Sequence, residues 1–239
     1  MTNEIYGIDY LRRRLADKQT RVLLRYKYYE MKNNAQDFSS LAPEKFKGLK
    51  ETVGWCAKAV DSLADRLQFD EFQNDEFNLS EIFLSNNQDI LIDSAVLSAL
   101  ISACSFVYIR EDNGYPRLQV IDGSNATGII DPVTNLLTEG YAVLERDSMG
   151  VVKTEAYFMA GMTEIYSHGV LVQRIPNAAP YALLVPIIYR PDAKRPFGHS
   201  RISRACIAYT QTALRTIKRS EVSAEFYSFP QKLSLIHIS

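Results

Sequence analysis

The pattern closest to a catalytic motif in this chain is a serine that follows a histidine. It lies in the segment GHSRI, residues 198–202, directly before a helical pattern. A nucleophile elbow needs a second glycine two residues after the serine, so that strand and helix can approach closely, and Ile202 takes that place. We therefore predict that Ser200 is the N-cap of a helix that begins at Arg201, where its hydroxyl accepts a backbone N–H.

Other signatures of enzymes and metal sites do not occur in the sequence. There is no GxxxxGK[ST] loop to bind phosphates, no GxGxxG fingerprint, no HExxH and no pair of cysteines at zinc spacing. The cysteines and histidines stand far apart, at Cys56, Cys104, Cys206, His168, His199 and His237. We therefore expect no catalytic residue, no cofactor and no metal ion, and unpaired thiols fit a reducing compartment.

Charge and composition narrow the class of protein further. The chain of 239 residues carries 27 Lys and Arg against 28 Asp and Glu, so a basic surface has to be local. The acidic stretch DEFQNDEF, residues 70–77, lacks the EF-hand spacing of oxygen ligands and reads as a solvated loop. The apolar stretch 90–109 is long enough to be weighed as a membrane span. However, it contains Asp93 and ends in a β-branched run, so we expect no membrane association.

Three amphipathic helices are expected in the first part of the chain. From about residue 10 to 32 there is no Gly or Pro, and apolar residues recur every three or four positions. A second stripe continues to Leu67, and its members are Val53, Cys56, Val60, Leu63 and Leu67. Ser85 followed by Gln88 has the spacing of a capping box, which predicts a third helix from about 85 to 102.

The middle of the chain changes to short runs rich in Val, Ile, Tyr and Thr. Turn clusters separate these runs, including DNGYP, DPVTN, SMG and SHG. Because no β-α-β alternation appears, the sequence predicts an α+β fold. We expect a helical part at 1–102, an antiparallel β-meander at 103–190, a loop and long helix at 191–232 and an atypical tail at 233–239.

Four segments in order resemble the portal, or head–tail connector, proteins of siphophages. They are LRYKYYEMKN with GWCAKAVDSLADRLQFDEF, SACSFVYIREDNGYPRLQVID, IIDPVTNLLTEGYAVLE, and LLVPIIYRPDAKRPFGHSRISRACIAYTQTALRTIKRSEVSAEFYSFPQK. The last is similar to an element of this family in which VP, an Arg and GHS precede a long helix and an aromatic with Pro-Gln. The resemblance covers residues 10–232. Portal subunits continue further, and LSLIHIS, residues 233–239, matches nothing in the pattern, so we expect it to be poorly packed.

The resemblance implies a structural subunit of the virion, assembled in the host cytoplasm and placed at one capsid vertex. Such subunits form a closed ring, usually of about twelve copies, through which double-stranded DNA is packaged and ejected. The partners that the resemblance implies are the terminase large subunit, a head–tail adaptor, and the capsid or scaffold protein.

The long helix after Ser200 is expected to have two different faces. Three- and four-residue spacing predicts an apolar stripe of Ile202, Cys206, Tyr209, Ala213 and Ile217. The opposite side would be cationic and would face a neighbouring subunit or DNA, and its candidate residues are Arg204, Gln211, Arg215 and Lys218. The alternative is that these side chains only keep that face soluble.

Two other classes of protein stay open as alternatives. One is a small hydrolase that uses Ser200 or the acidic loop, although no second glycine follows the serine. The other is a nucleic-acid-binding module, which basic clusters such as Arg12-Arg13-Arg14 would favour.

Overall fold

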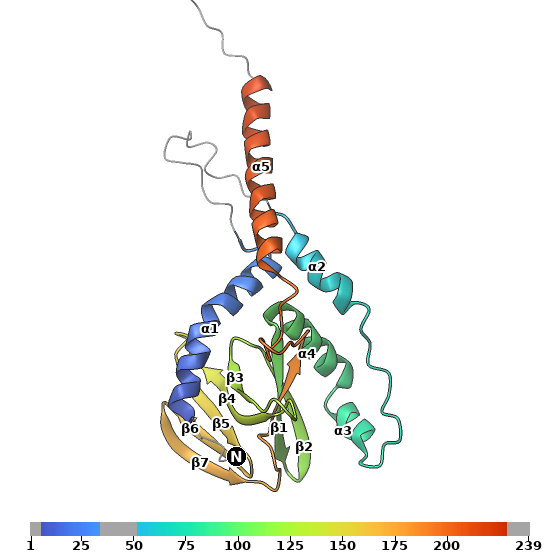
Figure 1. The fold of residues 1–239 in the computed structure, drawn as a ribbon, viewed down its shortest axis with the longest axis vertical. Coiled ribbons are helices and arrows are strands. Elements are labelled where there is room, and N and C mark those ends of the chain that lie inside the picture. The colour runs from blue at the N-terminus through green and yellow to red at the C-terminus, as the bar shows by residue number, and fades with distance from the viewer. Residues whose placement is uncertain (1–5, 34–51, 229–239) are drawn as a thin grey trace, which may run out of the picture.

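The computed structural model describes residues 6–33 and 52–228, and these form an α+β fold with a long helix that projects from its body (Figure 1). The predicted fold class is confirmed. The helices are α1 (Ile8–Tyr29), α2 (Trp55–Ala64), α3 (Leu79–Ser85), α4 (Gln88–Ser102) and α5 (Arg204–Ser228). None of the described helices is long and apolar enough to cross a membrane.

In the part of the chain that the structure describes, eight strands form two antiparallel sheets. The five-stranded sheet is a meander of β3 (Ala126–Ile130), β4 (Leu137–Arg146), β5 (Val152–Met159), β6 (Met162–Ser167) and β7 (Val170–Pro176). The three-stranded sheet has the order β2 (Tyr115–Ile121), β1 (Cys104–Asp112) and β8 (Leu184–Ile188). The antiparallel strands expected for 103–190 are present, and they divide into two sheets because β8 returns to pair with β1.

Tight turns set the register of two hairpins. Asn113 and Gly114 join β1 to β2 with φ angles of 53° and 79°. His168 and Gly169 join β6 to β7 with φ angles of 47° and 79°. Two consecutive positive φ angles are typical of a type I′ hairpin turn, so His168 serves a turn in the backbone.

The two sheets enclose the main core, and the helices build a second one. Phe106 of β1, Phe158 of β5 and Leu184 of β8 are fully buried in the first core. The second core joins α2 to α4 and the segment before α5 through Val60, Ile101 and other buried residues. In both cores the buried side chains share one face of their element. Apolar residues recur every second position along the strands and every third or fourth position along the helices.

The second and third helices differ from expectation at their ends. Helix α2 ends at Ala64, and Leu67 is 45% exposed and so does not extend the apolar stripe. Ser85 is the last residue of α3 and not a cap of α4, so the predicted capping box is wrong. The break has a physical cause in Asn86, whose side chain donates to Pro116 O at 3.1 Å and accepts from Leu118 N at 3.0 Å. The Asn86 amide thereby provides hydrogen-bond partners for backbone groups on the open edge of β2.

Candidate functional site

Helix α5 carries the residues for which a functional role is expected, and it stands out from the body (Figure 1). Its 25 residues correspond to a length of about 37 Å at the rise of an α-helix. The helix begins at Arg204, three residues later than predicted. Ser203 is its N-cap, because the Ser203 hydroxyl accepts the Cys206 N–H at 3.1 Å.

Ser200 has a different role from the predicted cap. Its hydroxyl donates to Ile101 O at 2.6 Å and accepts the Ile202 N–H at 2.9 Å. These bonds tie the segment before α5 to the end of α4. The adjacent His199 faces away to Asp192, with Nε2 and Oδ2 2.5 Å apart. The serine and histidine are therefore not arranged as a nucleophile and its base.

The backbone at Gly198 has a conformation and a close contact that require a glycine. Its φ is 73°, and a Cβ at this position would lie 2.2 Å from Tyr189 O. His199 N donates to the same carbonyl at 2.9 Å. The glycine of the GHS element therefore lets the chain cross closely over the end of β8 before it enters α5.

The base of α5 is fixed by contacts with α1 and α2. Cys206 Sγ lies 3.3 Å from Cys56 Sγ of α2, and Cys56 Sγ lies 3.4 Å from Thr210 Oγ1. Gln211 Nε2 donates to Tyr28 Oη at 2.5 Å. These contacts join residues 150 to 183 positions apart in the sequence, so the direction of α5 is set by the body.

The buried side of α5 is rotated relative to the predicted apolar stripe. Thr210 and Leu214 are 0% and 1% exposed, whereas Tyr209 is 69% exposed and Ile217 is 38% exposed. The prediction of the stripe is therefore wrong for Tyr209 and Ile217. The physical reason is that a threonine and a lysine stem occupy the buried positions, and a count of apolar residues alone does not find them.

The four predicted surface residues divide into two groups. Arg204, Gln211 and Arg215 are exposed. Lys218 is 2% exposed, so its placement on the solvent-facing cationic side is wrong. The exposed basic face of α5 consists of Arg204 and Arg215 with Gln211 between them, and its role in binding a neighbour or DNA stays a prediction.

Sequence reasoning missed a buried polar network that fixes α1 to the five-stranded sheet. Glu139 of β4 accepts the backbone N–H groups of Tyr6 and Gly7 at 2.8 and 3.0 Å and the Tyr157 hydroxyl at 2.6 Å. Glu155 of β5 accepts from the hydroxyl of Tyr141 and from the guanidinium of Arg12. Both carboxylates are 4% exposed.

The network is a hydrogen-bonded joint, in which Arg12 balances the charge of Glu155 and three donors satisfy Glu139. Burial raises the pKa of Tyr141 and of Tyr157 well above the usual value, and the neighbouring carboxylates add to the increase. Hydrogen bonding to Glu155 raises the pKa of Arg12, against the opposing effect of its burial. The sequence signal for this network was a Glu followed two positions later by a Tyr on both β4 and β5. Residues two apart share one face of a strand, so these side chains could be expected to lie together.

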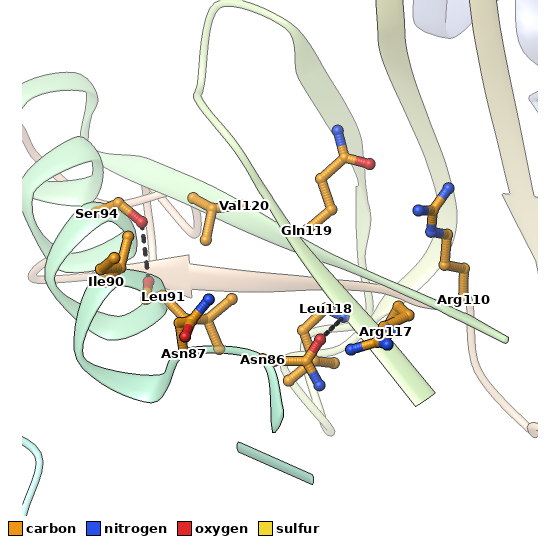
Figure 2. A pocket seen from close by; sticks show the side chains of 10 residues that line it. All are labelled: Asn86, Asn87, Ile90, Leu91, Ser94, Arg110, Arg117, Leu118, Gln119 and Val120. Carbon is orange, nitrogen blue, oxygen red and sulfur yellow. Dashed lines mark hydrogen bonds between the residues drawn. The ribbon is translucent and has the colours of Figure 1, made fainter. Parts of the chain in front are cut away.

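A hollow of about 420 Å³ lies between the start of α4 and the edge of β2 (Figure 2). Asn86 is directed at Leu118, and the Ser94 hydroxyl donates to Leu91 O at 3.0 Å. The side chains of Asn86 and Ser94 are thus engaged with backbone. Arg110 stands apart from the α4 side chains, so the hollow has no convergent set of charged groups.

The remaining candidates for chemistry are dispersed. Within residues 6–33 and 52–228, no group of three His, Cys, Asp or Glu side chains is placed to hold a metal ion. Asp75 of the acidic loop accepts the N–H groups of Leu79 and Ser80 at 2.7 Å each, so it caps α3. His237 and the tail 233–239 lie outside the described residues.

No family of known proteins matches this chain, and no curated protein matches it. The geometry of the chain and the resemblance of its four segments are thus the basis for a functional assignment.

Proposed function

We propose that this chain is a structural subunit of a tailed-phage portal ring. In this role it surrounds the DNA during packaging and ejection at the capsid vertex. It also provides the docking site for the terminase and the tail connector. This proposal joins the resemblance of the four segments to the architecture of the chain.

The observation that carries the proposal is the projecting helix α5 at the end of an α+β body (Figure 1). The resemblance implies helices, then a β-meander, then a long helix that leads away from the wing of the ring. The described elements follow this order, with α5 directly after the GHS element at residues 198–200.

A ring subunit must hold its parts in a fixed relation, because one interface repeats around the axis. The buried bonds of Glu139 and Glu155 fix α1 to the five-stranded sheet. Ser200 and Cys206 join the start of α5 to α4 and α2. If the angle between α5 and the body varied, the same deviation would occur in every subunit and the ring would not close. The joints that hold this angle therefore support the proposed role.

Repetition also gives a function to weak surface contacts. Arg204 and Arg215 are exposed on α5 and recur in every copy of a ring. Many weak contacts to phosphate groups add up in effective concentration, and each is reduced by salt. DNA in a channel lined by such helices would meet a ring of positive charge without a specific binding site.

The alternatives have less support in the geometry. A hydrolase centred on Ser200 would need a base within reach of its hydroxyl, and His199 is bonded to Asp192 instead. A nucleic-acid-binding module based on Arg12-Arg13-Arg14 would lose Arg12, which is held by Asp9 and Glu155.

Native mass spectrometry of the purified protein tests the proposal. A portal subunit gives one large closed oligomer with a single stoichiometry, and the mass does not grow with concentration once the ring is closed. A monomer at all concentrations, or a ladder of masses without an end point, contradicts the proposal.

A further inference from the structure

One face of α1 carries a row of positively charged side chains, and the proposed function assigns no role to them. Arg14, Lys18, Arg21 and Arg25 are four, three and four residues apart, so they share one helix face. Arg14 and Lys18 lie over the ring of Phe197, and Arg195 comes from the same loop before α5. We define the cationic surface as Arg14, Arg21, Arg25 and Arg195, with Lys18 beneath them.

These cations lack ion-pair partners in the described part of the chain. No carboxylate forms an ion pair with any of the five, whereas Arg12, Arg117, Lys153 and Arg174 each have one. Burial lowers the pKa of Arg25, and the nearby charges of Arg21 and Arg195 lower it further. Lys18 Nζ donates to Ala126 O at 2.6 Å and Arg25 donates to Ser102 O at 2.8 Å, so these two side chains are held against the body by backbone carbonyls instead of carboxylates.

A surface of opposite sign follows α2. We define the acidic surface as Asp65, Asp70, Glu71 and Glu76, all of which are exposed. None of these four carboxylates takes part in an ion pair within the described residues. Arg66 is the one cation in the same stretch of sequence, so the surface keeps a net negative charge.

Exposed apolar side chains accompany both charged surfaces. Beside the cationic surface, Leu24 of α1 is 45% exposed. Next to the acidic surface, Phe77 and Leu84 are 79% and 64% exposed. Apolar groups beside charged ones are typical of surfaces that bind other proteins.

The two surfaces come from different elements of the body. Figure 1 shows α1 on one side of the sheets, and α3 with the segment that leads to it from α2 on the other side. Contacts between two different surfaces of identical subunits are heterologous, and they generate a ring when the rotation closes. Complementary charges on two different surfaces of one subunit provide such a contact.

We propose that the cationic surface of one copy binds the acidic surface of the next copy, and that this contact orders the subunits around the ring. The inference rests on the proposed function and names its subunit interface. The second copy is the partner that the molecule itself indicates, because the acidic surface has the charge that the cationic surface lacks. Duplex DNA would also bind cations, but nothing in the chain accounts for the acidic surface in that case.

Charge reversal of each surface gives a direct test by sedimentation velocity. One variant carries Arg21→Glu with Arg195→Glu, and the other carries Asp70→Lys with Glu71→Lys. Each variant alone brings like charges together, and we expect its association to weaken by at least about tenfold. A mixture of the two variants pairs opposite charges at every contact, so we expect association to return.

A matched control and three outcomes make the test decisive. Arg13→Glu with Lys58→Glu changes the charge equally on exposed residues outside both surfaces and should leave association unchanged. If rings form with either reversed variant as with the parent protein, the inference is wrong while the proposed function stands. If the parent protein does not associate at all, both are wrong. If the cationic reversal abolishes binding of a labelled 30-base-pair duplex, a probe length of about three helical turns, and leaves association intact, the partner is DNA and the inference is overturned.

Discussion

The Tyr157 hydroxyl donates a hydrogen bond of 2.6 Å to Glu139, and both side chains are 4% exposed. The same carboxylate accepts the backbone N–H groups of Tyr6 and Gly7 at the start of α1. One side-chain pair therefore links two strands of the sheet to a helix that lies more than 130 residues earlier in the sequence.

Removal of the Tyr157 hydroxyl should lower the stability of the fold. In Tyr157→Phe the buried carboxylate of Glu139 loses a donor, and such a loss costs about 1–3 kcal/mol. Urea unfolding followed by circular dichroism measures the difference. Tyr209→Phe is the control, because Tyr209 is 69% exposed and should change the free energy of unfolding little. Equal stability of the two variants would show that the network does not hold α1.

The stability of the protein should fall when the pH rises above about 10, the usual pKa of tyrosine. Burial raises the pKa of Tyr141 and Tyr157 in the folded state, so the folded state keeps protons that the unfolded state releases. Their contribution is fully present below the unfolded pKa and is lost as the pH rises toward the folded pKa. The urea midpoint should decrease from pH 9 to 12. The decrease should be smaller in the double variant Tyr141→Phe with Tyr157→Phe, and an equal decrease would contradict this assignment.

Cys206 should react slowly with alkylating agents in the folded protein. Burial, followed by the contact with Cys56, raises the pKa of Cys206 to about 11. The reactive thiolate is then about two orders of magnitude less populated at pH 8 than in an ordinary thiol. Mass spectrometry after iodoacetamide treatment measures the rate, and the urea-unfolded protein is the reference. A rate as fast as the unfolded reference would show that α5 does not pack on α2 as described.

The exposed basic face of α5 should contribute to DNA packaging or to the contact between neighbouring subunits. Rings with Arg204→Glu and Arg215→Glu should package less DNA or bind a neighbouring subunit more weakly, while the subunit keeps its fold. The control is again Arg13→Glu with Lys58→Glu. If the double variant assembles and packages like the parent at physiological salt, the basic face is only a solvated surface.

Periodicity predicted most of the elements because it reflects burial on one face. The stripe that contains Cys56 and Val60 packs as expected, and the turn at Asn113-Gly114 was visible as a hairpin signal. The pairing of β8 with β1 was not predictable in this way. These strands are about 80 residues apart, and local patterns contain no information on which distant strand provides an edge.

The site was harder to predict than the fold. Lys218 looked like a surface cation and is buried, and Ser200 looked like a cap and instead bonds to Ile101 O. In both cases the outcome depends on tertiary neighbours. The carboxylates of Glu139 and Glu155 were hidden for the same reason, since their partners lie in α1 and on adjacent strands.

Negative-stain electron microscopy of the purified protein tests the proposed ring most directly. We expect class averages of closed particles with one rotational symmetry and a central opening. Particles that stay single, or that join into open chains of variable length, would contradict a portal subunit.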